Sequence, residues 1–173
     1  SGKKAAAIVQ DLLTLARRGV SNFEVINLND VIFEYLKSPE FEKLKSFHPL
    51  VDIKTDLKSD LLNIKGSAVH LSKTVMNLFS NAAEAMSKGG EIFIKTENQY
   101  IERSEIACDD IEEGDYVVMT ISDTGIGIAP EELDRIFEPF YTKKVMGRSG
   151  TGLGMAVVWG TVKDHNGYIK VTS

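Results

Sequence analysis

The spacing of hydrophobic and polar residues predicts a chain that mixes helices and strands along its length. Apolar residues recur at helical spacing over residues 3–18, 28–35, 68–87 and 156–165. Shorter segments predict strands or extended pieces over residues 50–57, 62–65, 91–96, 116–122 and 168–171. This order predicts an α+β fold, a two-layer α/β sandwich whose mixed, mostly antiparallel sheet is covered by helices on one face.

Turn and capping residues mark the ends of several of these elements. Asn27 or Asn29 is the expected N-cap of the second helix. Pro39 and Pro49 interrupt the region that follows it. Lys88-Gly89-Gly90 is expected to end the long third helix. That helix should face the core with Leu71, Val75, Leu78, Ala82 and Ala85.

The first predicted helix, residues 3–18, has a broad apolar stripe and is stopped by Gly19. A stripe of this width needs a partner. The sequence leaves two partners open, either the remainder of the same domain or another helix in a bundle.

Composition and charge narrow the function classes. The 173 residues are 43% hydrophobic, enough for one compact domain. The net charge of −5 argues against nucleic acid as a partner. Cys108 is the only cysteine, which excludes an internal disulfide, and it begins an acidic stretch expected to form a hairpin loop. We find no signal peptide and no apolar run long enough to span a membrane, so we expect a cytoplasmic location. Ser1-Gly2 is an unusual start for a natural protein, which leaves open a parent protein that is anchored in a membrane.

The first candidate motif lies on the long helix. Asn77, Asn81 and Glu84 occupy positions i, i+4 and i+7 and therefore share one face. Amide oxygens suit Mg²⁺, which takes few protein ligands beside phosphates and water. A solvated polar helix face is the alternative.

The second motif, Asp123-Thr124-Gly125-Ile126-Gly127-Ile128, follows a predicted strand directly. The Asp123 carboxylate can accept a hydrogen bond from an exocyclic amine, and the glycines allow a tight turn against a flat ligand. The alternative is an ordinary turn into a helix that opens at Pro130.

The third motif, Gly150-Thr151-Gly152-Leu153-Gly154, leads into the last helix, whose N-terminus offers an anion site. Its spacing matches neither a P-loop nor the dinucleotide fingerprint. Between the second and third motifs lies a loop with Lys143, Lys144 and Arg148, which is a candidate lid with cations for a triphosphate.

In this order, the motifs resemble the N, G1, F and G2 boxes of the GHKL ATP-binding superfamily, which includes histidine kinases and gyrase B. The resemblance runs from about Leu50 to the end and implies a Bergerat-type fold, with ATP and Mg²⁺ as ligands. It implies magnesium binding by Asn81, adenine recognition by Asp123 and catalytic positions at Asn77, Asn81 and Lys143. The ATP-binding residues that it implies are Asn81, Glu84, Ala85, Asp123, Gly125, Gly127, Ile128, Phe137, Phe140, Thr142, Lys143, Lys144, Gly150, Thr151, Gly152, Leu153 and Gly154.

One position separates branches of this superfamily. Hydrolytic members carry a glutamate general base where this chain has Asn77, whose amide cannot take a proton. The chain therefore resembles the sensor histidine kinases, and its Asn81–Met86 run resembles the nitrogen-regulation and hybrid subclass. Many histidine kinases have a basic residue in place of Glu84, which leaves the role of Glu84 open; Lys143 or Lys144 would supply the charge.

The resemblance also predicts how the chain is organised. Residues 1–19 would be the second helix of a dimerisation hairpin, and residues 20–173 the catalytic ATP-binding domain, without the C-terminal strand that the family usually has and with reduced nucleotide affinity. His48, His70 and His165 lack the context of a phosphoacceptor, so the accepting histidine would lie in the parent's dimerisation domain. The expected partners are that histidine, a response regulator receiver domain and a second copy of the parent. Two alternatives stay open, an ATPase or serine-directed kinase of the superfamily, and a degenerate interaction domain that binds no nucleotide.

Overall fold

The computed structural model describes residues 22–103, 111–138, 141 and 153–173. Its main sheet has three strands in the order β2 (Val51–Leu57), β4 (Gly90–Ile101) and β5 (Gly114–Asp123). β2 pairs with β4 in parallel, and β4 pairs with β5 antiparallel. The sheet is therefore mixed, as predicted, and the β4–β5 pairing confirms the hairpin.

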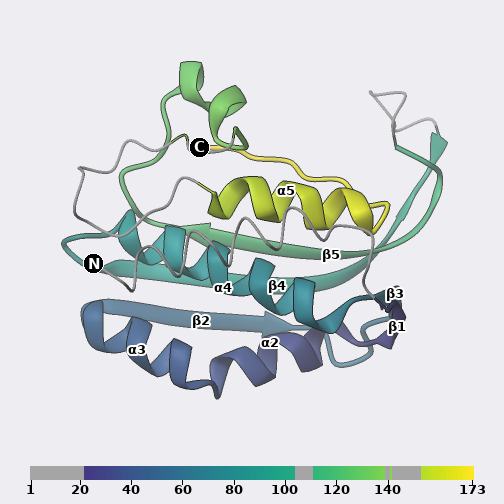
Figure 1. The fold of residues 1–173 in the computed structure, drawn as a ribbon, viewed down its shortest axis with the longest axis horizontal. Helices are drawn as coiled ribbons and strands as arrows, with labels where there is room; N and C mark the ends of the chain where they lie inside the picture. Colours follow the sequence, from purple (N-terminus) through teal and green to yellow (C-terminus); the bar gives the residue numbers. More distant parts are fainter. Residues whose placement is uncertain (1–21, 104–110, 139–140, 142–152) are drawn as a thin grey trace.

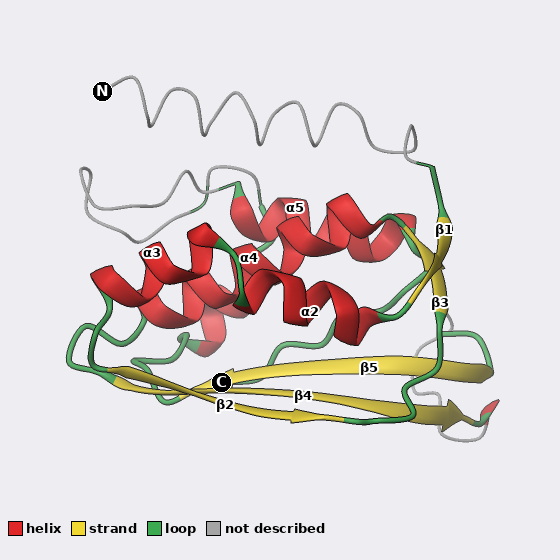
Figure 2. Ribbon diagram, turned by 90° about the horizontal axis from the view of Figure 1, so that it is seen from below, coloured by secondary structure: helices red, strands yellow, loops and turns green. Residues whose placement is uncertain are grey.

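In the described part of the chain, four helices cover one face of this sheet (Figure 2). They are α2 (Leu28–Leu36), α3 (Pro39–Phe47), α4 (Ala68–Glu84) and α5 (Gly154–Asp164). A small second sheet at one end pairs β1 (Glu24–Ile26) with β3 (Ile64–Gly66) antiparallel. Figure 1 shows α4 and α5 side by side, and Figure 2 shows both above the sheet. This arrangement confirms the two-layer α+β sandwich.

The core lies between α4 and the central strand β4. Val75, Phe79, Ile92 and Ile94 are completely buried there. Tyr35 packs against Phe79 with ring centroids 5.2 Å apart. Burial raises the pKa of Tyr35 to about 12, with a smaller contribution from the nearby Glu40 carboxylate.

Several predicted helix boundaries are confirmed, and others are wrong. Asn27, not Asn29, caps α2 through its side chain. α3 was not predicted from the sequence, because we took Pro39 as a break. Proline instead fits the first turn of this helix, and Ser38 caps it. α4 ends at Glu84 instead of residue 87, since Ala85 already closes the last turn.

The last part of the chain differs from the prediction in three respects. The segment that opens at Pro130 is a 3₁₀ helix, η2 (Pro130–Arg135), and α5 begins two residues earlier than predicted. The predicted strand over residues 168–171 is wrong, because these residues join no strand ladder within the described chain. Side chains attach the segment instead: the Tyr168 and Tyr116 rings lie 5.9 Å apart, edge to face.

Both long strands exceed their predicted bounds, and β1 was not predicted at all. β4 continues to residue 101, and β5 begins at residue 114, because the two strands pair with each other over ten positions. The predicted helix over residues 3–18 lies outside the described residues.

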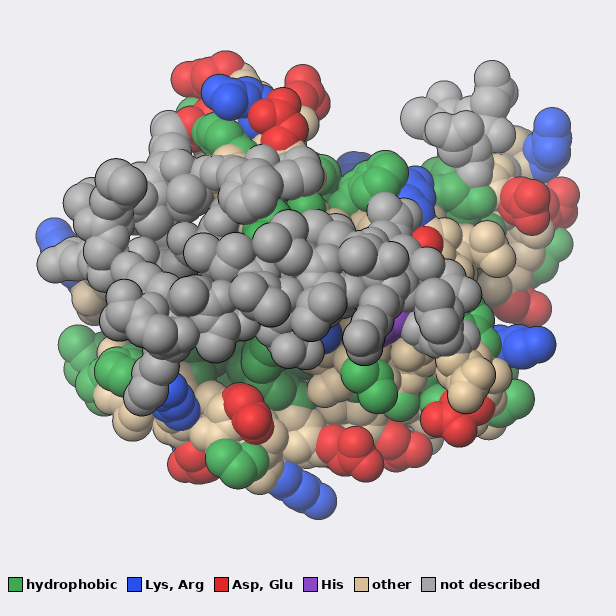
Figure 3. Space-filling view, viewed as in Figure 1, with side chains coloured by type: hydrophobic (Ala, Val, Ile, Leu, Met, Phe, Trp, Pro, Cys, Tyr) green, Lys and Arg blue, Asp and Glu red, His purple; other side chains and the backbone are tan. Residues whose placement is uncertain are grey.

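The described surface mixes charges. In Figure 3, both acidic and basic side chains are visible around the rim, in keeping with the modest net charge of −5. Among the described helices, none combines the length and the apolar character needed to cross a membrane.

Candidate functional site

One face of α4 carries the first motif. Asn77, Asn81 and Ala85 are spaced at i, i+4 and i+8, and all three are half-buried. Ala85, which we expected to face the core, is only partly covered and lies on the same face as the two amides. The face is therefore partly open to solvent and accessible to a ligand.

The second motif folds onto the C-terminal end of this face. Asp123 ends β5, and its Oδ1 accepts a hydrogen bond from the Gly125 N–H at 2.8 Å. The Ile126 N–H then donates to the Ala85 carbonyl at 3.1 Å. A Cβ on Gly125 would lie 2.6 Å from that carbonyl oxygen, so only glycine allows this close approach.

Hydrogen bonds on both sides of Gly125 hold this loop in place. Thr124 exchanges two hydrogen bonds with Glu91, at 3.2 Å through its N–H and at 3.0 Å through its hydroxyl. Gly127 has a φ of +73°, and the Ile128 N–H donates to the Ser173 hydroxyl at 2.7 Å. Ser173 was not a predicted site residue, because this contact joins positions 45 residues apart.

The third motif reaches the other end of the same face. α5 begins at Gly154, and the Asn77 side-chain amide donates to the Gly154 carbonyl at 3.4 Å. Leu153, directly before α5, is completely buried. Within the described residues, no side chain caps the N-terminus of α5. Its first N–H groups are therefore suited to an anion.

Glu84, whose role the sequence left open, has a partner on its own helix. The Ser80 hydroxyl donates to the Glu84 carboxylate at 3.2 Å. The bond spans one helical turn, so it holds the carboxylate along α4.

The segment before the predicted lid is held by its own side chains. Tyr141 donates its hydroxyl to Glu132 at 2.7 Å, and the Arg135 guanidinium lies 4.5 Å from the Tyr141 ring centre. Phe137, in the same segment, is half-buried. The remaining predicted site residues lie outside the described chain and stay predictions; these are Phe140, Thr142, Lys143, Lys144, Gly150, Thr151 and Gly152.

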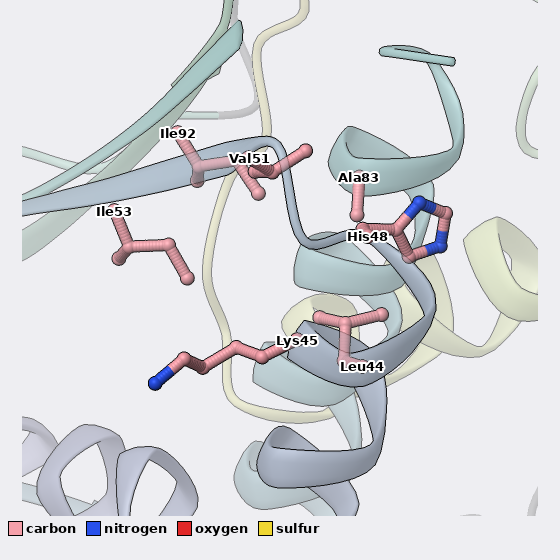
Figure 4. Close-up of a pocket in the computed structure, with 7 residues that line it drawn as sticks. All are labelled: Leu44, Lys45, His48, Val51, Ile53, Ala83 and Ile92. Carbon is pink, nitrogen blue, oxygen red and sulfur yellow. The ribbon is translucent and has the colours of Figure 1, made fainter. Parts of the chain in front are cut away.

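A small cavity between α3 and the sheet is not this site. Its volume is about 10 Å³, which is barely enough for one water molecule. Figure 4 shows the residues around it, which are Leu44, Lys45, His48, Val51, Ile53, Ala83 and Ile92. None of these is a predicted site residue, and the cavity is too small for a ligand.

Comparisons with known proteins match the chain to one family. Residues 66–173 match the family described as histidine kinase-, DNA gyrase B-, and HSP90-like ATPase. Sensor kinase CckA of Brucella abortus is 34% identical over 174 residues, covering 100% of this chain and 18% of that protein. Sensor histidine kinase ZraS of Salmonella typhimurium is 30% identical over 168 residues, covering 96% of this chain and 32% of the relative.

Solved structures show the same fold. The nucleotide-free catalytic domain of histidine kinase ThkA is 25% identical, with a TM-score of 0.63 over 83% of this chain and 81% of that one. Full-length ShkA in complex with AMPPNP is 24% identical, with a TM-score of 0.65 over 95% of this chain and 32% of that one. Since the family match covers more than half of the residues, the chain belongs to the histidine kinase-, DNA gyrase B- and HSP90-like ATPases, a family that binds ATP.

Proposed function

We propose that residues 20–173 are the catalytic domain of a sensor histidine kinase, which binds Mg²⁺-ATP and donates the γ-phosphoryl group to a histidine outside this chain. Relatives named as sensor kinases support this proposal over the whole length of the chain. These relatives are much longer, so the parent's activity and partners form part of the proposal.

The observation that carries the proposal is the convergence of three motifs on one helix face. Asn77 bonds to Gly154 of the third motif, and Ala85 receives the Ile126 N–H of the second. Asn81 lies between them, one helical turn or about 6 Å from each along α4. A nucleotide whose base meets the second motif and whose phosphates meet the third would extend along this face.

Asp123 is suited to recognise adenine. Its Oδ1 already accepts the Gly125 N–H, and a carboxylate has acceptor capacity for further donors. An exocyclic amine is such a donor. The bond to Gly125 also fixes the orientation of the carboxylate before any ligand arrives.

The described residues fit Mg²⁺ held together with phosphates. Among them, no group of three or more His, Cys, Asp or Glu side chains could hold a metal ion alone. Mg²⁺ in phosphate sites keeps waters and takes only one or two protein oxygens. Asn81 would supply one such oxygen, and the bound ion would neutralise charge on the phosphates.

Asn77 supports transfer over hydrolysis. Its amide donates to the Gly154 carbonyl, which a glutamate side chain in its ionised form could not do. The position therefore holds α5 against α4 and does not activate water. Catalysis by this chain rests on positioning and on stabilising charge.

His165 is unsuited to accept a phosphoryl group, because both of its ring nitrogens already have partners within the domain. We place the acceptor histidine in the parent's dimerisation domain, to which residues 1–19 would contribute the second helix of a hairpin. The parent would then act as a homodimer on the cytoplasmic side, and its phosphoryl group would pass to a receiver domain. A ThkA structure was solved in complex with a response regulator protein, TrrA.

Calorimetric titration with Mg²⁺ and a non-hydrolysable ATP analogue tests the pocket. Asp123→Asn should weaken binding at least tenfold. The asparagine has one side-chain oxygen, which can accept either from the Gly125 N–H or from the adenine amine, and its NH₂ group would then face the other donor. Asp52→Asn is the matched control, since Asp52 is an exposed residue of β2 that pairs with Lys54. Equal affinity in Asp123→Asn and wild type would contradict adenine recognition, and an equally large loss in Asp52→Asn would show a nonspecific charge effect.

A further inference from the structure

The imidazole of His165, directly after α5, has a defined hydrogen-bonding state. The Ser67 N–H donates to its Nε2 at 3.0 Å. Its Nδ1 lies 2.7 Å from the Thr161 carbonyl oxygen, which can only accept. The ring is therefore neutral, with its proton on Nδ1.

This contact completes the N-terminal cap of α4. Ser67 is the N-cap, and its hydroxyl accepts from the His70 N–H. In a capping box, a Glu or Gln at the third helical position would bond to the N-cap N–H. That position is His70 here, and His165 from the other helix receives the N–H instead.

The ring is held in a tight place. It stacks on Phe23, the residue before β1, with centroids 4.6 Å apart and an interplanar angle of 22°. A Cβ on Gly66 would lie 2.7 Å from the ring. The imidazole therefore occupies the space that a side chain at position 66 would need.

α5 is thus fastened to α4 at both of its ends. At its start, the Gly154 carbonyl accepts from Asn77, and after its end, His165 accepts from Ser67. Each pair of anchor points is separated by ten or eleven residues, or roughly 15 Å along its helix. The His165–Ser67 contact after the end of α5 therefore limits how α5 can rotate about the Asn77–Gly154 contact at its start, where the candidate nucleotide site lies.

We propose that His165 is a positioning residue for the nucleotide site. By accepting the Ser67 N–H at the N-terminus of α4, His165 holds the N-terminus of α5 in its position beside Asn77 and Asn81. This inference rests on the proposed function. It assigns His165 no contact with the nucleotide.

The test compares His165→Ala with His165→Gln, whose amide oxygen can still accept the Ser67 N–H. His165→Ala should weaken binding of the Mg²⁺-ATP analogue about fivefold, the value of one hydrogen bond, while the Gln variant stays within about twofold of wild type. Ser67 amide hydrogen exchange should accelerate in the Ala variant alone. His48→Gln, the same change at the end of α3, is the matched control and should leave both values unchanged.

Gly66→Ala provides a second route if His165→Ala folds poorly. It displaces the ring without removing it, and Gly66 has no left-handed φ that would strain an alanine. It should also lower nucleotide affinity. Faster Ser67 exchange with unchanged affinity in the folded Ala variants would overturn the inference, because His165 would then be only a local cap. No binding by the wild-type chain would overturn the proposed function instead.

Discussion

A partly buried hydrogen-bond network joins α2 to β4 and to the end of β2 and should contribute to stability. Asn29 is only 8% exposed, and its Oδ1 accepts from the Thr96 hydroxyl at 2.8 Å. Its side-chain NH₂ donates to the Lys58 carbonyl at 2.8 Å. The Lys58 N–H returns to the Thr96 hydroxyl at 3.1 Å, which closes the network.

Asn29→Ala should lower the free energy of unfolding by about 1–3 kcal/mol. It leaves the buried Thr96 hydroxyl proton without an acceptor, and an unsatisfied buried group costs about 1–3 kcal/mol, whereas the Lys58 carbonyl keeps the Leu61 N–H as a donor. Alanine forms helices better than asparagine, so the propensity change in α2 opposes the predicted loss.

Asn98→Ala is the matched control because Asn98 also bonds two backbone groups. It accepts from the Leu62 N–H at 2.9 Å and donates to the Asp60 carbonyl at 3.1 Å, both at exposed positions. Water can replace these bonds, so we expect a loss of only about 0.5–1 kcal/mol. Urea unfolding followed by circular dichroism measures both variants, and a loss in Asn29→Ala no greater than in Asn98→Ala would refute the reasoning.

Three further predictions concern the core and the site. Burial raises the pKa of Tyr35 to about 12, against about 10 in the unfolded chain, so its contribution to stability is complete below about pH 10 and is lost between about pH 10 and 12. The urea midpoints at pH 8 and pH 11 should therefore differ more in wild type than in Tyr35→Phe. Gly125→Ala should lower the unfolding free energy by about 1–3 kcal/mol because its Cβ collides with the Ala85 carbonyl, whereas Gly154→Ala, with 3.6 Å of clearance, should be neutral or slightly stabilising; equal melting temperatures would contradict this steric argument. Asn81→Ala should abolish the Mg²⁺ dependence of nucleotide binding, and titrations with and without Mg²⁺ that differ as much as in wild type would rule out Asn81 as the ligand.

Local patterns in the sequence were sufficient for the elements that carry the site. The helical spacing of Asn77 and Asn81 placed both amides on one face of α4, since that periodicity depends only on residues three or four apart. The position of Asp123 after an apolar run likewise placed it at the end of β5. The roles of these residues toward a nucleotide stay proposals.

Features that depend on distant partners could not be predicted. The segment over residues 168–171 has the residue types of a strand, but a strand also needs a neighbour with free backbone groups, and side chains hold this segment instead. The β1–β3 pair is only three residues long on each side, too short for a periodic signal. The His165–Ser67 bond joins positions 98 residues apart, and nothing local to either residue indicates it.

The position of α4 explains why its sequence combines a buried stripe with a polar edge. One side packs against the sheet through Val75 and Phe79, which are completely buried. The adjoining face receives the Ile126 N–H at Ala85 and holds Gly154 at Asn77. A shift of α4 on the sheet would therefore move the candidate adenine and phosphate contacts together. The fit of this helix to the core is thus part of the geometry of the nucleotide site, and core substitutions under α4 should change nucleotide affinity as well as stability.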